Sequence, residues 1–347
     1  LNAPPLRYVP GPPVGLLVVS SAEFADDPIL AAFLASKTRR GLQVTHVSTT
    51  EIGSSATEIR GYIRNAFWNW AVPPTFVLLV GDTPGIPHWS GIADPFFAPT
   101  DLYYGAVWQE DAFADYYPDI AVGRLSVDNP TQLHNILGKI RSYEEVGWTG
   151  NDTWEKYATF MAGRDHFGDQ EGQFNAVIGA FLDPLGYSVD SLYCVSHGAT
   201  TQQASEALNE GRALLSYNGH GSEVMWLDGP VFRQTDITRL TNEVYPLIQS
   251  YSCMTGDYSV PECIGETWIR GPHGAVGFFG SSRDSATLLD GILSWHFYEA
   301  AYNAQANWYP VNQTWMGGMV IYAKLAYADH IAAAWSRSYL EQYNFLG

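Results

Sequence analysis

Short apolar runs alternate with longer amphipathic stretches along nearly the whole chain. Several runs are continuously apolar and rich in Val, Leu and Phe, a pattern typical of parallel strands that are covered on both faces. Strands are predicted at residues 16–19, 43–48, 76–80, 120–125, 157–162, 187–192, 213–218, 247–252 and 275–280. Helical pattern dominates from residue 288 onward, and earlier helices are predicted at residues 28–40, 55–70, 130–145, 171–182, 201–210 and 262–269. Strands that alternate with helices in this way predict an α/β fold with mainly parallel sheets.

Local signals support several of these boundaries and divide the chain. Residues 55–58 read Ser-Ala-Thr-Glu, which has the Ser-x-x-Glu form of a capping box, and Pro130 stands at the start of another predicted helix. Residues 83–118 are rich in aromatic residues, Pro and Gly, so this segment is predicted to be irregular. The best internal boundary lies near residue 147, and we therefore expect two α/β subdomains, residues 1–147 and residues 148–347.

Composition and charge exclude several classes of protein. The chain has 347 residues with a net charge of −18, and it contains no run of Lys and Arg that would serve nucleic-acid binding. No stretch of about 20 apolar residues occurs, so no membrane span is expected. The three cysteines cannot all pair with one another, so at least one thiol should be free. Because Leu1 is not an initiator Met, we interpret the sequence as a processed or cut product.

Polar residues follow three of the predicted strands in the second half of the chain. His220 comes after the strand at residues 213–218, Cys253 follows the next strand, and Asp165 follows the strand at residues 157–162. In open α/β sheets the functional groups gather just beyond the carboxyl ends of the strands. If these three strands are parallel neighbours, the His, Cys and Asp side chains converge at one end of the sheet.

A cysteine beside a histidine is sufficient for acyl transfer. The thiolate attacks a carbonyl carbon, and the imidazole accepts the thiol proton and later delivers it to the leaving group. Gly221 allows a tight turn and presents an unhindered N–H, so the N–H groups of Gly221 and Cys253 are the candidate oxyanion donors, worth about 3 kcal/mol each. A lone Cys or His is more often structural, and only their common position after apolar strands favours catalysis.

Motifs for other chemistry are absent or incomplete. The sequence has no Gly-x-Ser-x-Gly elbow, no P-loop and no His-Glu-x-x-His zinc motif. Cys194 and His197 have a zinc-like spacing, but no second pair accompanies them. An acidic loop is a candidate calcium site with oxygen ligands, although solvated carboxylates are the simpler interpretation of each residue. Its candidate ligands are Asp111, Asp115 and Asp119.

Two motifs carry a resemblance to a known family. Residues 217–223 (Tyr-Asn-Gly-His-Gly-Ser-Glu) and residues 252–258 (Ser-Cys-Met-Thr-Gly-Asp-Tyr) resemble the gingipain family of cysteine peptidases, and the His-Gly and Ser-Cys pairs are similar to the wider caspase-like clan. The likeness extends from about residue 75 to the end and includes residues 100–104, 117–124, 263–266 and 274–282.

The resemblance implies a fold, a set of roles and a biological setting. It implies a caspase-like core of two Rossmann-like subdomains, with His220 and Cys253 as the catalytic dyad. The third, imidazole-facing acid falls on Asp165, where the best-known members have Glu. Gingipains are secreted or cell-surface enzymes that are made as zymogens and bind calcium. The resemblance therefore implies protein or peptide substrates, an inhibitory pro-segment and structural calcium, without an organic cofactor.

The same resemblance suggests how substrate is recognised. An acidic residue that reads a basic P1 side chain falls on Glu171, with Asp169 as the alternative if the alignment slips by two residues. Such a carboxylate is required physically because a charged P1 group needs a partner once it is desolvated. The simpler roles are a helix N-cap for Asp169 and a first-turn helix acid for Glu171. Further substrate contacts implied by the matching motifs are Met254, Ser281 and Ser282.

These observations lead to one main hypothesis and two alternatives. The sequence predicts a secreted cysteine endopeptidase that works through a Cys253 thioacyl-enzyme, with His220 as general acid and base and a preference for basic P1 residues. The first alternative is a processing transpeptidase of a secretion system, because an amine can replace water in resolving an acyl-enzyme. The second is a non-catalytic binding module on the same fold.

Overall fold

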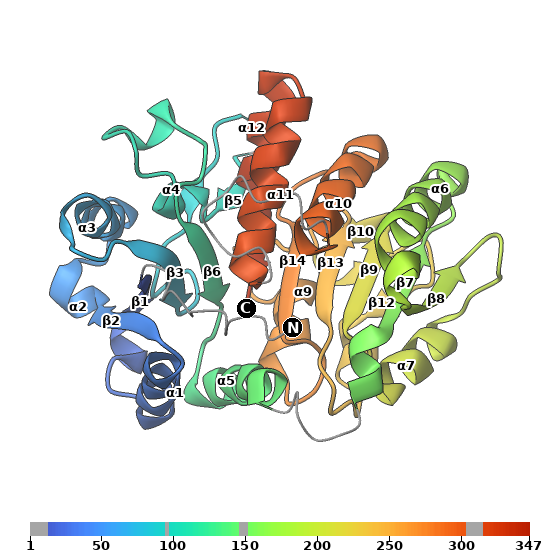
Figure 1. The fold of residues 1–347 in the computed structure, drawn as a ribbon, viewed down its shortest axis with the longest axis horizontal. Coiled ribbons are helices and arrows are strands. Elements are labelled where there is room, and N and C mark those ends of the chain that lie inside the picture. The colour runs from blue at the N-terminus through green and yellow to red at the C-terminus, as the bar shows by residue number, and fades with distance from the viewer. Residues whose placement is uncertain (1–12, 94–96, 146–151, 303–314) are drawn as a thin grey trace, which may run out of the picture.

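Strands from both halves of the chain form one large mixed sheet (Figure 1). The computed structural model describes residues 13–93, 97–145, 152–302 and 315–347. In spatial order the strands are β2 (Leu42–Ser48), β1 (Val14–Ser20), β3 (Pro74–Val80), β6 (Ala121–Leu125), β15 (Tyr343–Leu346), β14 (Gly277–Ser281), β13 (Leu247–Tyr251), β9 (Leu214–Asn218), β7 (Tyr157–Ala162) and β8 (Ser188–Tyr193). The predicted strands are thus confirmed to within a few residues. The predicted boundary at residue 147 lies outside the described residues.

The last strand joins two groups of strands that run in opposite directions. All neighbouring pairs are parallel except β14 and β15, which are antiparallel, while β15 is parallel to β6. The carboxyl ends of β1, β3 and β6 therefore lie at the opposite end of the sheet from those of β13, β9 and β7. In Figure 1 β3 and β6 lie on one side of the C-terminus, which follows β15, and β14, β13 and β9 lie on the other.

Helices cover both faces of the sheet because the strands are apolar on both faces. Leu215 contributes to the core under α1, α5, α7 and α9, whereas its neighbour Leu214 packs with α6, α10 and α11. A third cluster fills the space between the first strands and α3. The helices are α1 (Pro28–Arg39), α2 (Thr49–Ile52), α3 (Ala56–Asn69), α4 (Leu102–Gly105), α5 (Pro130–Glu145), α6 (Phe167–Val177), α7 (Thr201–Glu210), α8 (Gln234–Ile237), α9 (Ile264–Arg270), α10 (Thr287–Tyr302), α11 (Met316–His330) and α12 (Ala333–Gln342).

Local signals in the sequence correspond to observed caps. Ser55 and Glu58 form the expected capping box of α3, and Pro130 is the first residue of α5. The predicted helix at residues 171–182 begins earlier than expected, at Phe167, and its last turn is a π-helix over residues 178–182. The N-cap of α6 is His166, so the N-cap role considered for Asp169 is wrong.

The segment between β3 and β6 and the strand ends carry small additional elements. Residues 83–93 and 97–118, the part of this segment that the structure describes, are mostly irregular, as predicted, but contain α4 and a two-stranded sheet of β4 (Trp89–Ser90) and β5 (Pro99–Thr100). A second small sheet follows β9 and consists of β10 (Gly221–Ser222), β11 (Met225–Trp226) and β12 (Phe232–Arg233). Of the helices in the described residues, none combines the length and the apolar character needed to span a membrane.

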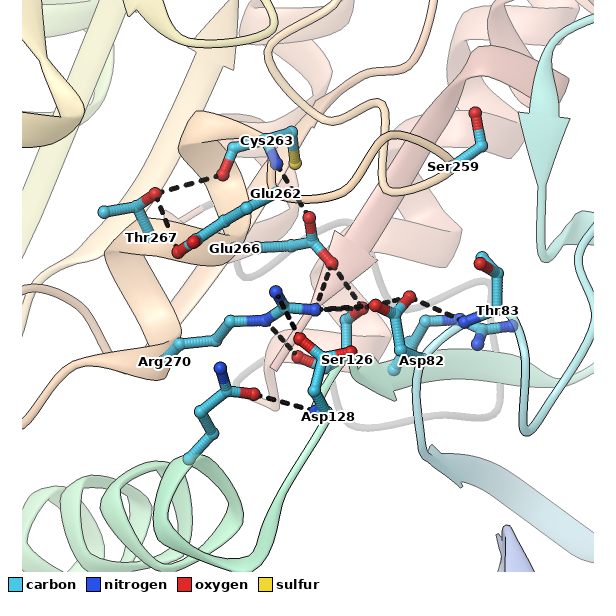
Figure 2. A network of polar contacts seen from close by, with 12 residues as sticks. Asp82, Thr83, Ser126, Asp128, Ser259, Glu262, Cys263, Glu266, Thr267 and Arg270 are labelled. Carbon is cyan, nitrogen blue, oxygen red and sulfur yellow. Dashed lines mark hydrogen bonds and ion pairs between the residues drawn. The ribbon is translucent and has the colours of Figure 1, made fainter.

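A buried charge network ties the two strand groups together at the end of the sheet where β3 and β6 finish (Figure 2). Arg270 at the end of α9 pairs with Asp82 at 2.9 Å, with Asp128 at 3.0 Å and with Glu266 at 2.6 Å. Glu266 also accepts hydrogen bonds from the Ser126 hydroxyl and the Cys263 N–H. One guanidinium cannot neutralise three carboxylates, and Glu266 is the most deeply buried of them. Burial accordingly raises the pKa of Glu266 to about 8, although Arg270 acts in the opposite direction.

This raised pKa predicts a pH-dependent stability. The unfolded Glu266 carboxyl loses its proton near its ordinary pKa of about 4.3, whereas the folded one keeps it up to about pH 8. Between these values the folded state binds more protons, so this group makes the free energy of unfolding fall as the pH rises. We expect the free energy of unfolding, measured by denaturant titration, to fall less from pH 5 to pH 8 in Glu266→Gln than in the wild type. The control is Glu262→Gln, which changes an exposed carboxylate beside the same helix. Equal slopes in wild type and Glu266→Gln would contradict the assignment.

Candidate active site

The three strands that precede the predicted catalytic residues are parallel neighbours. Asn218 at the end of β9 is aligned with Tyr251 of β13 on one side and with Ala162 of β7 on the other. Three adjacent strands therefore end side by side, and the loops that follow them carry His220, Cys253 and Asp165 at the same end of the sheet. The condition under which the sequence brings these three residues to one end of the sheet is therefore met.

Asp165 and His220 are in direct contact. His220 Nε2 lies 3.0 Å from Asp165 Oδ2, and their side chains are 55% and 70% exposed, respectively. A hydrogen bond from Nε2–H to this carboxylate leaves Nδ1 of the imidazole as the free basic nitrogen. Since both side chains are open to solvent, their pairing orients the ring but contributes little to stability.

The Cys253 thiol lies at the start of the turn that follows β13. Its sulfur accepts a hydrogen bond from the Ser285 N–H at 3.3 Å and lies 3.7 Å from the Ser285 carbonyl oxygen. Burial is the main cause that raises the pKa of this thiol, and the charges of Asp284 and Asp290 act in the same direction. The Cys253 sulfur therefore faces Ser285, and its raised pKa means that the thiol needs a base to become a nucleophile.

Two residues beside these groups have strained backbones. Met254 follows Cys253 with a φ of 57°, and His166 follows Asp165 with a φ of 54°. Residues other than Gly rarely adopt this left-handed conformation, and such residues cluster at functional sites. The turn at Met254 is held by its N–H, which donates to the carbonyl of Arg283, while Arg283 pairs with Asp257 at 2.5 Å.

Gly221 brings the histidine loop against the cysteine loop. A Cβ at this position would lie 2.2 Å from Ser252 Oγ, 2.8 Å from Thr255 Cγ2 and 3.0 Å from the Cys253 carbonyl oxygen. No larger residue fits without separating the two loops. Gly221 thus lies against the backbone of Cys253, where the two predicted oxyanion donors are close neighbours.

The predicted substrate-binding residues occupy different environments. Met254 is half-buried beside Cys253, and Asp169 is exposed in the first turn of α6. Glu171 is buried, and its carboxylate accepts hydrogen bonds from the hydroxyl and the N–H of Ser196. Ser281 and Ser282 are fully buried, and their hydroxyls donate to backbone carbonyls. The structure therefore places both serines beneath the site rather than on its surface.

A buried acid that the sequence did not single out lies close to the thiol. Asp290 in α10 accepts hydrogen bonds from the hydroxyls of Tyr339, Tyr343 and Ser285, and Ser285 is the residue that contacts the Cys253 sulfur. Burial raises the pKa of Asp290 to about 6, while the three hydroxyl donors act in the opposite direction. The signal in the sequence was a single Asp within the apolar helix at residues 287–302.

The acidic loop surrounds a buried cation supplied by the chain itself. The Arg60 guanidinium donates to the carbonyls of Tyr103, Ala106, Gln109 and Glu110. Burial lowers the pKa of Arg60, while the negative charges of this loop act in the opposite direction. Among the described residues, no group of three or more His, Cys, Asp and Glu side chains has an arrangement that could hold a metal ion. The carboxylates of Asp111, Asp115 and Asp119 each accept a backbone N–H of their own segment. Calcium binding stays a prediction.

All three cysteines are free thiols, which confirms that at least one thiol is unpaired. Cys263 is fully buried at the start of α9, where burial raises its pKa well above the usual range. Cys194 is partly exposed and lies 3.1 Å from the Nε atom of Arg164. Cys253 is thus the thiol that follows β13, the strand next to the one that leads to His220, at the carboxyl ends of parallel strands.

A thiol, an imidazole and a carboxylate that orients the imidazole are groups that thiol-dependent peptidases use, and here they follow three adjacent parallel strands. The chain belongs to peptidase family C25, whose sequence profile matches residues 10–347. It is 31% identical over 290 residues to Lys-gingipain of Porphyromonas gingivalis, which covers 79% of this chain but 16% of that protein. It is 28% identical over 284 residues to gingipain R2 of the same species, covering 77% of this chain and 36% of that protein.

Solved structures of related proteins have the same fold. The crystal structure of the Arg-specific cysteine proteinase gingipain R superposes with a TM-score of 0.84 and 23% identity, covering 96% of this chain and 77% of that one. The complex of the Porphyromonas gingivalis RgpB pro- and mature domains gives a TM-score of 0.83 and 22% identity, covering 96% of this chain and 78% of that one. The expected caspase-like α/β fold is therefore confirmed.

The contact of the histidine loop with the cysteine loop at Gly221 leads to a prediction about activity. Gly221→Ala should lower kcat by about 100-fold, because displacements of about 1 Å at a catalytic site cost this much. The matched control is Gly172→Ala on α6, where an added Cβ meets nothing within 4 Å. Steady-state hydrolysis of a peptide substrate by the two folded variants tests this. Wild-type kcat in Gly221→Ala would show that the two loops need not be in contact.

Proposed function

We propose that this chain is a cysteine endopeptidase in which Cys253 is the nucleophile and His220 is the general base and acid. The observation that carries the proposal is the position of Cys253, His220 and Asp165 beyond the carboxyl ends of the adjacent strands β13, β9 and β7. Membership of peptidase family C25 supports it. Because the chain spans only 16% of the Lys-gingipain to which it is similar, the activity is proposed for this chain rather than transferred from that protein.

Each group has a role in the acylation step that we propose. Nε2–H of His220 donates to Asp165, so Nδ1 accepts the proton of Cys253 as the sulfur turns from Ser285 toward the imidazole. The thiolate adds to the scissile carbonyl, and the N–H groups of Gly221 and Cys253 stabilise the negative oxygen that forms. His220 then protonates the departing amine, and the carbon–nitrogen bond breaks to leave a thioacyl-enzyme.

Deacylation repeats the sequence with water as the nucleophile. His220 removes a proton from water, the hydroxide attacks the thioester carbon, and the Cys253 thiolate leaves and recovers a proton from the imidazolium. A transpeptidase differs only in this step, since an amine takes the place of water. The exposed His220 and Asp165 side chains leave this face of the site open to solvent, and this favours hydrolysis.

We also propose that the enzyme prefers a basic P1 residue. Two buried carboxylates are candidates for this role, Glu171 on α6, the helix that follows Asp165, and Asp290 on α10, which contacts Ser285 next to the thiol. Either one offers the negative partner that a desolvated guanidinium or ammonium group requires. The names of the relatives, Lys-gingipain and Arg-specific gingipain R, support a basic residue at this position.

We further propose that the protein is secreted or lies at the cell surface, and that a pro-segment inhibits it before maturation. The support for a pro-segment is the relative whose structure pairs pro- and mature domains. The support for an extracellular setting is the likeness to the gingipains, which the matched motifs around His220 and Cys253 carry.

The first test concerns the nucleophile. Cys253→Ala should abolish peptide hydrolysis while leaving the unfolding curve near that of wild type, because one small side chain replaces another. Iodoacetamide should inactivate the wild type, and mass spectrometry should locate the alkyl group on Cys253 before Cys194 or buried Cys263. Adding an amine acceptor should give little ligated product. Undiminished hydrolysis in Cys253→Ala would end the proposal, and a predominance of ligated product would favour a transpeptidase.

The second test concerns P1 specificity. Wild type, Glu171→Gln and Asp290→Asn are compared on matched peptides with Arg, Lys, Leu or Asp at P1. We expect the wild type to favour Arg or Lys, and the variant that has lost the P1-binding carboxylate to lose about 100-fold in kcat/KM on these peptides alone. The unaffected variant serves as the control for the other. A wild type that favours Leu or Asp, or a basic preference that survives in both variants, would contradict the assignment.

A further inference from the structure

A carboxylate outside the predicted catalytic set lies between the histidine loop and the loop that carries Asp165. Asp228 follows β11, and all four of its described hydrogen bonds come from those two loops or the strand before them. Oδ2 accepts from the N–H of Arg164 at 2.9 Å and from the N–H of Asp165 at 3.1 Å. Oδ1 accepts from the N–H of His220 at 2.8 Å and lies 2.8 Å from the Tyr217 hydroxyl. One side chain therefore connects the backbones of both members of the His220–Asp165 pair.

Two glycines make room for this carboxylate. A Cβ at Gly163 would lie 2.3 Å from both oxygens of Asp228, and a Cβ at Gly219 would lie 2.5 Å from Oδ1. These glycines precede the Arg164–Asp165 and His220 segments, respectively. The backbone of each loop can thus approach Asp228 closely only because neither glycine has a side chain.

The backbone carbonyl of His220 is also held in place, by Tyr217 and by Leu227, the residue before Asp228. The His220 carbonyl accepts from the N–H of Leu227 at 2.8 Å, and the Tyr217 hydroxyl lies 2.8 Å from that carbonyl as well as from Asp228. Burial, followed by the negative charge of Asp228, raises the pKa of Tyr217 well above its usual range. The phenol therefore keeps its proton and acts as a donor here. Both backbone polar groups of His220 are fixed by residues 217–228.

We propose that Asp228 is a positioning residue that fixes the separation of Asp165 and His220 and thereby orients the imidazole toward Cys253. The side-chain contact between Asp165 and His220 is largely exposed, and exposed pairs contribute too little to hold two loops in register. Asp228 supplies the missing constraint through backbone N–H groups, whose hydrogen bonds to a carboxylate are strong and directional. This inference rests on the proposed peptidase function and adds a residue to it.

Asp228→Asn is the sharpest test because every partner of the carboxylate donates a hydrogen. An Asn amide has one acceptor oxygen and one NH₂ group, so its NH₂ must face either the N–H groups of Arg164 and Asp165 or that of His220. We expect kcat to fall by about 10- to 100-fold, with KM within about twofold of wild type, since orientation rather than substrate binding is lost. The rate of Cys253 alkylation at neutral pH should fall with kcat, because both depend on His220.

A loss that came only from lower stability would have a different signature. Folded Asp228→Asn would then keep the wild-type kcat below its unfolding temperature, and this result would overturn the proposal. Combining Asp228→Asn with Asp165→Asn should cost less than the product of the two separate losses, because both residues act through His220. Fully multiplicative losses would contradict action through a common imidazole. The matched control is Asp27→Asn, which alters a carboxylate that accepts two backbone N–H groups at the start of α1.

A milder variant tests the same idea if Asp228→Asn does not fold. Tyr217→Phe keeps the ring that stacks on Trp226 and removes only the hydroxyl beside Asp228 and the His220 carbonyl. We expect a loss of about threefold to tenfold in kcat and in Cys253 alkylation rate, with KM unchanged. Unchanged kcat in Tyr217→Phe, beside an active wild type, would then overturn this inference alone. A wild type with no peptidase activity and no selective alkylation of Cys253 would overturn the proposed function and this inference together.

Discussion

The parallel pairing of β9 with β13 is the constraint on which the rest of the site depends. Five aligned pairs, ending with Tyr251 opposite Asn218, bring the loops that begin at Gly219 and Ser252 side by side. β7 pairs with the other edge of β9 and brings Asp165 to the same end of the sheet. Each side chain then needs only a short turn to meet its partner. The strand order therefore decides which side chains come together at this end of the sheet, and the loops set their positions.

The ten-stranded sheet is held together by a short strand and a buried charge network. β15 is antiparallel to β14 and parallel to β6, so it reconciles two groups of strands that run in opposite directions. At the end of the sheet away from the site, Arg270 connects α9 to Asp82 and Asp128 beyond the first strands. The loops that carry Asp165, His220 and Cys253 thus project from a sheet that is anchored at its far end by apolar packing and by charge.

Close approach of backbone to backbone, and of backbone to carboxylate, gives the site its shape. Gly221 allows the histidine loop to lie on the cysteine loop, and Gly163 and Gly219 admit the Asp228 carboxylate between two loops. Met254 and His166 hold left-handed conformations immediately after Cys253 and Asp165. Groups beneath the exposed His220–Asp165 contact therefore support it. Asp165 faces the imidazole, whereas Asp228 holds the backbones of Asp165 and His220 in position.

The sequence by itself predicted nine of the ten strands of the large sheet, most helices and the candidate pair of His220 and Cys253, because these follow from local periodicity, caps and the rule that function gathers at carboxyl strand ends. It did not reveal β15, since residues 343–346 follow a helix directly and gain strand pairing only from distant β14 and β6. Ser281 and Ser282 were predicted to meet substrate, but the strand register and the packing of α12 bury them. Asp228 and Asp290 have no sequence motif, because their roles come from donors contributed by separate loops and helices. Only the tertiary structure brings those donors together.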